Sequence, residues 1–244
     1  MDNSDKGGKL LTIREAAAFL SVSVMSVRRW TNAGTLKCYR VGSKDERRFR
    51  MEDLQAFIEG HRPAVPLGIG GLELEGPAHI SHFYRTEDES LDVGLAYVKQ
   101  GLDLGELILV VAPEPRQLEL LGRLEDLGAI VPVLLDQKIL TMSSGLPTPE
   151  AQGAMVDDLL RKAKRWNGFR LLGDMVWTKA HRWGLETLAA LESLTNRQRP
   201  GKQATFLCQY CLDDFSRDTA FMAMQTHDHT LYHGRLNASP YYGM

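Results

Sequence analysis

The spacing of apolar positions predicts two short helices near the start of the chain. Thr12 followed by Glu15 has the pattern of a capping box, in which side chains satisfy the free backbone amides of a helix start. Apolar residues then recur every three or four positions through residues 13–20 and again through 24–32, which is the periodicity of packed helices. Because only the turn at residues 21–23 separates them, the two segments match the helix-turn-helix pattern.

A hairpin and a closing helix are predicted next. Residues 36–41 and 47–50 read as two strands joined by a turn at 42–46. Residues 51–59 have the apolar spacing of a helix that packs back on the unit. Residues 10–60 are therefore predicted to form a small winged helix-turn-helix domain.

Strand-like and helix-like segments alternate from residue 78 to the end of the chain. Near-continuous apolar strands between helices are typical of a mainly parallel sheet covered on both faces, so we expect an α/β domain over residues 78–244. The predicted strands are 79–84, 106–111, 131–135, 139–142, 169–177 and 205–211. The predicted helices are 91–101, 116–127, 150–166, 184–196 and 216–226, and the residues after them are expected to be irregular.

Residues 61–77 are predicted to be a linker between the two domains. Proline and glycine are frequent in it, at Pro63, Pro66, Gly68, Gly70 and Gly71. Proline interrupts helices and glycine loosens the chain, so no long helix is expected here. Any contact that makes a homodimer should then come from the second domain.

The charge of the chain is unevenly distributed, although its net value is only −2. Residues 24–50 carry eight Lys and Arg side chains against two Asp and Glu, which indicates a surface for the phosphates of double-stranded DNA. The second predicted helix would face the major groove, and the hairpin would contact the backbone. The candidate DNA-binding residues are Ser23, Met25, Ser26, Arg28, Arg29, Arg40, Lys44, Arg47, Arg48 and Arg50.

Composition points to a cytoplasmic protein. No run of about 18 apolar residues is present, and the first residues lack the apolar segment of a signal peptide, so no membrane partner is expected. The three cysteines are too few for a disulfide framework, which fits a reducing compartment.

Pairs of metal-ligand residues occur within two predicted strands, but their spacing disfavours metal binding. Cys208 and Cys211 would point to opposite faces of one strand, and so would His79 and His82. We therefore expect no metal and no cofactor. No nucleophile, base and orienting group stand at a recognisable spacing, so we do not expect an enzyme.

Candidate ligand contacts lie where the predicted strands end, because pockets of open α/β sheets form outside the carboxyl ends of strands. A small, weakly polar effector would suit their aromatic and polar side chains. The candidates are His82, Tyr84, Asp174, Trp177, Gln209 and Tyr210, with His227 and Tyr241 or Tyr242 closing over them.

Two family resemblances add to this reading. The motifs Thr12–Ala17, Val27–Trp30 and Arg47–Phe49 resemble the MerR/excisionase family of winged helix-turn-helix domains, although the long dimerisation helix of MerR proteins is missing. The motifs His79–Tyr84 and Gly168–Trp177, together with Leu207–Tyr210, Thr226–His227 and Asn237–Tyr242, resemble the MEDS domain, a sensory module of DcmR-type regulators.

The second resemblance implies a RecA- or KaiC-like sheet and a role in sensing simple hydrocarbon derivatives. A phosphate-binding loop of the G-x-x-x-x-G-K-[ST] type is absent from the sequence, so nucleotide hydrolysis is not expected. The resulting hypothesis is a one-component transcription regulator whose second domain binds a small effector.

Two alternatives remain open. One is an architectural or excisionase-like DNA-binding factor whose large domain makes protein contacts only, and the other is an enzyme with a DNA-binding appendage. An apolar pocket with converging polar groups would favour the sensor, whereas a sheet without a cavity would favour the interaction domain.

Overall fold

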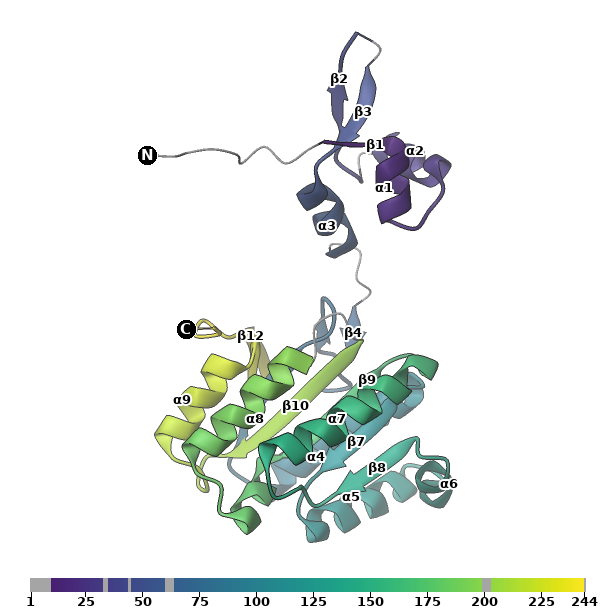
Figure 1. Ribbon diagram of the computed structural model, residues 1–244. Helices are drawn as coiled ribbons and strands as arrows, with labels where there is room; N and C mark the ends of the chain where they lie inside the picture. The colour runs from purple at the N-terminus through teal and green to yellow at the C-terminus, as the bar shows by residue number, and fades with distance from the viewer. Residues whose placement is uncertain (1–9, 33–34, 44, 60–63, 199–202, 244) are drawn as a thin grey trace, which may run out of the picture. The chain divides into compact units, whose positions relative to one another are not determined.

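The computed structural model describes residues 10–32, 35–43, 45–59, 64–198 and 203–243. The chain divides into two units, Met1–Pro63 and Ala64–Met244. Figure 1 shows the elements of both, and each unit is described by itself below.

The first unit has the predicted order of helices and hairpin, with one additional short strand. Its elements are β1 (Leu11–Thr12), α1 (Ile13–Phe19), α2 (Val24–Asn32), β2 (Tyr39–Val41), β3 (Glu46–Phe49) and α3 (Met51–Glu59). The sheet order is β1-β3-β2, with all neighbours antiparallel. Its core contains Ala16, Ala17, Val27, Leu36, Phe49 and Leu54.

The capping predictions for the first unit are confirmed. The Glu15 amide donates to Thr12 Oγ1 at 3.2 Å, and the Thr12 amide donates to Glu15 Oε2 at 2.7 Å. Ser23 Oγ accepts from the Ser26 amide at 3.1 Å, which satisfies a free donor at the start of α2.

The second unit is an α/β domain with a mainly parallel sheet, as predicted. The sheet order is β12-β11-β6-β10-β9-β7-β8, and only the β11–β12 pair is antiparallel. The strands are β6 (His79–Tyr84), β7 (Leu107–Val111), β8 (Leu140–Ser143), β9 (Phe169–Asp174), β10 (Ala204–Cys211), β11 (His229–Tyr232) and β12 (Arg235–Ala238).

Helices cover both faces of this sheet (Figure 1). One face packs on α4 (Glu87–Asp103), α5 (Glu114–Asp126) and α6 (Val131–Asp136). The opposite face packs on α7 (Pro149–Lys162), α8 (Leu185–Gln198) and α9 (Arg217–Thr226). Successive strand residues alternate between the faces: Leu107, Leu109 and Val111 point to the α7–α8 side, and Ile108 and Val110 to the α4–α5 side.

The segment predicted as a linker belongs mostly to the second unit. It contains a two-stranded sheet, β4 (Val65–Pro66) and β5 (Glu73–Leu74), and Leu67 is fully buried in the core of that unit. The guanidinium of Arg170, itself fully buried, donates to the backbone carbonyls of Pro66 and Leu67 at 3.0 and 3.4 Å. Apolar residues between the glycines therefore dock this segment.

Three other expectations for the second unit were wrong. Residues 131–135, predicted as a strand, belong to α6, whose first turn accommodates proline. Strand β9 ends at Asp174, so Trp177 lies in a 3-10 helix, η2 (Met175–His181); a shorter one, η1, spans Ala163–Arg165. The tail expected to be irregular contains the β11–β12 hairpin.

Candidate functional sites

The second helix of the first unit presents a polar face to solvent. Val27 is fully buried, and Val24 and Trp30 pack against the core, as the sequence predicts. Met25 is 69% exposed, and Arg28 is also exposed. The other DNA-binding candidates on and next to α2 differ in exposure. Ser23 and Arg29 are exposed, whereas Ser26 is half-buried.

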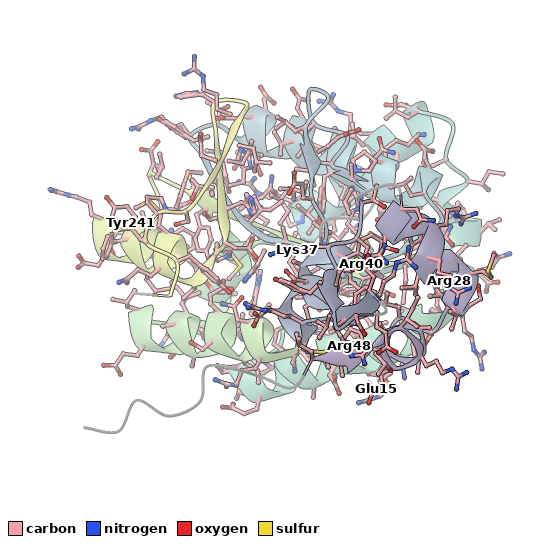
Figure 2. All side chains as sticks on the ribbon, turned by 90° about the horizontal axis from the view of Figure 1, so that it is seen from above. Glu15, Arg28, Lys37, Arg40, Arg48 and Tyr241 are labelled. Atoms are coloured by element: carbon pink, nitrogen blue, oxygen red, sulfur yellow. The ribbon has the colours of Figure 1, made fainter. Side chains whose placement is uncertain are left out.

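Arginines from α2 and the hairpin line one shared hollow. This hollow has a volume of about 500 Å³, and Figure 2 labels three of the arginines that border it, Arg28, Arg40 and Arg48. Sequence reasoning did not single out Arg14, which also lines it. The remaining lining residues are Thr12, Ile13, Asp45, Glu46 and Arg47. A hollow that gathers five guanidinium groups can bind an anion such as a DNA phosphate.

Most hairpin arginines make local contacts at the surface. Arg40 donates to the Asp45 carbonyl at 3.1 Å, Arg48 pairs with Glu46 at 2.6 Å, and Arg50 pairs with Glu52 at 3.3 Å. Exposed pairs of this kind contribute about 0–1 kcal/mol, so phosphates can replace them. Lys44, another candidate, lies outside the described residues.

Arg47 differs from its neighbours because it joins the hairpin to α2. Its Nη2 donates to Asn32 Oδ1 at 2.5 Å, and its Nε is buried without a hydrogen-bond partner among the described residues. We infer that Arg47 fixes the hairpin relative to the helix in addition to carrying charge.

In the second unit, four of the seven candidate ligand residues meet on the α4–α5 face. Gln209 lies 3.2 Å from His82 Nδ1 and accepts from Ser90 Oγ at 3.2 Å. The Tyr84 hydroxyl donates to Asp174 Oδ1 at 3.3 Å. The second oxygen of Asp174 pairs with Arg116 Nε at 3.1 Å.

A cavity of about 30 Å³ opens beside these groups. Its apolar wall consists of Leu91, Gly94, Val110, Ala112, Leu120 and Leu172, and its polar wall consists of Glu87, Ser90, Arg116, Glu119, Asp174 and Gln209. It lies where β7 and β9 end: β7 leads to α5 on one face of the sheet, whereas β9 leads to η2 and α8 on the other. Ligands of open α/β sheets bind at such a topological switch point.

Burial changes the ionisation of these groups. It lowers the pKa of His82 to about 4, so this imidazole is neutral at pH 7. Burial also raises the pKa of Asp174, and the neighbouring Arg116 offsets this only in part. The pKa of the Tyr84 hydroxyl is raised, again mainly by burial.

The other three candidates lie on the opposite face of the sheet. Trp177 lines a second cavity of about 30 Å³, together with Glu192 and Cys208. The Tyr210 hydroxyl donates to Glu192 Oε1 at 2.5 Å, and His227 is fully buried beside the same carboxylate. The seven residues therefore do not form one pocket, and their ligand contacts stay predictions.

The C-terminal tyrosines lie elsewhere. Tyr241, which is labelled in Figure 2, packs on the exposed ring of Phe221 and is itself 40% exposed. Tyr242 is also exposed. Neither residue is among the described side chains that line the two cavities. Their expected closure over the other candidates therefore has no support in this structure and stays a prediction.

Four buried metal-ligand side chains converge on the α8–α9 face, although the sequence argued against a metal site. Their donor atoms all lie within 4.8 Å of one another and come from His79, Glu192, Cys208 and His227. The pairs weighed in the sequence are split by the sheet: His79 lies 3.4 Å from Cys208 Sγ on this face, whereas His82 faces Gln209 on the other. Glu192 was not identified as a candidate from the sequence, because its position has no regular spacing to His79, Cys208 or His227.

Burial has the largest single effect on the pKa values of Glu192, Cys208 and His227 in this cluster. It lowers the pKa of His227 to about 3 and raises the pKa of the Cys208 thiol well above its usual value. For Glu192, burial would raise the pKa, but the interactions with His227, His79 and Tyr210 together outweigh burial and lower it. The cluster thus holds a carboxylate in a fully buried position.

Among the described residues, no helix is both long and apolar enough to cross a membrane.

Comparison with known proteins assigns both units. Residues 10–62 match a family described as a helix-turn-helix domain. The sequence is 28% identical, over an alignment 242 residues long that covers 91% of this chain and 91% of the relative, to the transcriptional repressor DcmR of Methylorubrum extorquens (strain DSM 6343 / CIP 106787 / DM4). Residues 78–228, more than half of the chain, match the family described as MEDS, the MEthanogen/methylotroph, DcmR Sensory domain. The chain therefore belongs to the MEDS domain family, with a helix-turn-helix domain at its N-terminal end.

Proposed function

We propose that this protein is a one-component transcription repressor that binds double-stranded DNA through its first unit and a small effector through its second. The observation that carries the proposal is the presence, in one chain, of an arginine-lined helix-turn-helix unit and an α/β unit with a cavity at its topological switch point. The DcmR relative is a transcriptional repressor, and the alignment covers 91% of its length. This similarity supports the same function.

The walls of the α4–α5 cavity define the chemistry of the effector. Half of the described lining residues are apolar. Among the charged ones, Arg116 pairs with both Asp174 and Glu87, and Glu119 adds a further acidic side chain. The first turn of α4 carries Glu87, Asp88 and Glu89, which disfavours a phosphate group there. These features fit a small uncharged molecule with one or two polar atoms, such as a simple hydrocarbon derivative.

The same observations weigh on the alternatives. A sheet with no cavity would have supported a domain that makes only protein contacts, but each face of this sheet has a cavity with polar and apolar walls. An enzyme would need a nucleophile that is hydrogen-bonded to a base, and no such pair is found among the described residues that line the α4–α5 cavity. The sensor therefore has the stronger support.

A pair of glycine substitutions tests the proposal. A Cβ at Gly94 would lie 3.0 Å from Leu172 Cδ2 and 3.6 Å from Gln209 Oε1, and would narrow the cavity. A Cβ at Gly122 on α5 would meet nothing within 4 Å, so Gly122→Ala is the matched control. The DNA site is first obtained by selection from randomised duplexes. Its affinity for each variant is then measured with and without a panel of short-chain alcohols, aldehydes and haloalkanes.

We expect at least one member of the panel to change the DNA affinity of the wild-type chain and of Gly122→Ala. Gly94→Ala should bind the same DNA without effector but respond less to that compound. An equal response of both variants would contradict the assignment of the cavity. If no duplex is selected, DNA binding itself fails.

A further inference from the structure

The buried cluster on the α8–α9 face has the geometry of a four-ligand metal centre. His79 Nε2 lies 3.3 Å from Glu192 Oε2 and 3.4 Å from Cys208 Sγ, and His227 Nε2 lies 3.7 Å from Glu192 Oε2. A tetrahedral ion with ligands at 2.0–2.3 Å separates neighbouring donor atoms by about 3.3–3.8 Å. These three of the six donor separations match the edges of such a tetrahedron, and all four donor atoms lie within 4.8 Å of one another.

The surroundings fix both histidines in the tautomer that a metal requires. Asn196 Nδ2 donates to the Thr226 carbonyl at 2.6 Å, so its Oδ1 faces His79 and accepts from Nδ1–H at 3.0 Å. His227 Nδ1 lies 2.7 Å from the Ala223 carbonyl, which can only accept. Each imidazole therefore carries its proton on Nδ1 and directs the lone pair of Nε2 into the cluster. Hydrogen bonds of this kind orient metal-binding histidines.

Without a cation, the lone pair of His79 Nε2 has only the weak donor of the Cys208 thiol, at 3.4 Å. His227 Nε2 is buried and has no hydrogen-bond partner among the described residues. Glu192 receives the Tyr210 hydroxyl on Oε1, which leaves Oε2 facing the two imidazoles. Buried acceptors that face one another are costly unless a positive charge lies between them.

We propose that His79, Glu192, Cys208 and His227 bind one divalent zinc-class ion. Two neutral imidazoles, one carboxylate and one thiolate carry two negative charges, which a divalent ion balances within the protein. The Cys208 thiol gives its proton to solvent when the sulfur binds the ion. Borderline-soft ions such as Zn²⁺ and Co²⁺ prefer this mixture of nitrogen, sulfur and oxygen.

The position of the centre indicates a structural role. Its ligands come from β6, α8, β10 and the residue after α9, so the ion joins two helices to the sheet. Four protein ligands close the coordination sphere, as in structural zinc sites. Because Cys208 and Glu192 also line the cavity that contains Trp177, the ion would fix one wall of that cavity.

The experiment uses the full chain without a metal-binding tag, stripped with a chelator and titrated with Zn²⁺ or Co²⁺. Cys208→Ser removes a ligand, and Cys211→Ser is the control because Cys211, on the same strand, lies outside the cluster. Asn196→Ala removes the hydrogen bond that orients His79. We expect one ion per chain, a thiolate-to-cobalt charge-transfer band, and a rise in melting temperature on metal addition.

Cys211→Ser should bind the metal with wild-type affinity. Asn196→Ala should bind it about 10–100-fold more weakly. Cys208→Ser should lose more metal affinity than Asn196→Ala and show no charge-transfer band. Equal affinities of the two cysteine variants would overturn the proposal. If Cys208→Ser does not fold, the spectrum of the wild-type chain decides. Cobalt binding without a thiolate band, or no stoichiometric binding, would overturn the proposal. The cluster would then be a hydrogen-bonded pair of His79 and Glu192 that shares a proton instead of a metal ion.

Discussion

At the scale of single residues, the burial of His82 should make the second unit sensitive to acid. Its folded pKa of about 4 lies below the unfolded value of about 6.5. As the pH falls from 7 to 5, the unfolded chain takes up a proton that the folded chain refuses, and stability decreases by about 2 kcal/mol. His82→Gln should remove this part of the pH dependence, as measured by urea unfolding at both pH values.

Exposed His233 supplies the control for this measurement. His233→Gln should leave the difference in stability between pH 7 and pH 5 as it is in the wild-type chain. If His82→Gln also leaves that difference unchanged, His82 is not the group that takes up the proton on unfolding.

Two arginines of the first unit should separate base recognition from phosphate binding. We predict that Arg28, on α2, contacts base edges, so Arg28→Ala should lower discrimination at one base pair by about 1–3 kcal/mol. Arg40 lies on the hairpin, and Arg40→Ala should weaken binding to all duplexes and reduce the salt slope by about 1. Selection from randomised sites, followed by salt titration, measures both. A loss of sequence preference in Arg40→Ala alone would reverse the two roles.

Arg47 shows the limit of residue-level prediction from sequence. Its charge and its place in a basic segment made it a DNA-binding candidate, like Arg48. The hydrogen bond to Asn32, 15 residues earlier, depends on how the hairpin packs and has no signature in the local pattern. For this reason Arg40 is a better probe of phosphate binding than Arg47.

At the scale of elements, Arg170 should hold the β4–β5 segment on the second unit. Besides the carbonyls of that segment, it pairs with Glu106 Oε2 at 2.5 Å and donates to the Tyr97 carbonyl at 3.0 Å. Arg170→Met would leave the Glu106 carboxylate buried without its cation and would remove the guanidinium donors from the Pro66, Leu67 and Tyr97 carbonyls, so we expect the free energy of unfolding to fall by about 3–5 kcal/mol.

The control for this prediction is Arg161→Met. Arg161 forms an exposed pair with Asp157 on α7, which contributes less than about 1 kcal/mol. Chemical unfolding of both variants measures the difference. If Arg170→Met lowered the free energy of unfolding as little as Arg161→Met does, the apolar residues alone would hold the β4–β5 segment on the second unit.

Elements with a clear period were predictable, and those with a short apolar run were not. The 3.6-residue period located α4, α5, α7, α8 and α9. Residues 131–135 are an apolar run that fits a strand or a buried helix equally well, and tertiary packing decided for the helix. The β11–β12 turn at His233 and Gly234 has positive φ at both positions, the geometry of a type I′ hairpin. Gly234 was therefore an available signal for a hairpin.

At the scale of the whole molecule, the sequence could not reveal which side chains meet across the sheet. Candidates chosen for lying near strand ends are divided by the sheet into two groups of four and three, because strand residues alternate between its faces. The buried cluster combines residues 79, 192, 208 and 227, which share no local spacing. Only the order β6-β10 in the sheet brings His79 next to Cys208.

The last prediction concerns self-association. A single helix-turn-helix unit contacts few bases, and specific regulators usually place two such units on two half-sites. Among the described residues, α3 ends at Glu59 and β4 begins at Val65, which leaves too short a stretch for a long dimerisation helix, and we predict a homodimer through the second unit. Leu118 on α5 is a large apolar side chain that is 63% exposed, and we expect it to lie in the contact.

Light scattering of residues 64–244 at tens of micromolar tests this, and the fragment starts at 64 because β4 and β5 belong to its core. We expect a dimer, and Leu118→Glu should convert it to a monomer because a carboxylate would then be buried in the contact. Phe221→Glu changes an exposed aromatic residue on α9, on the other face of the sheet, and should leave the mass unchanged. A monomeric fragment beside a dimeric full chain would place the contact in the first unit, and a dimer insensitive to Leu118→Glu would place it on another surface of the second.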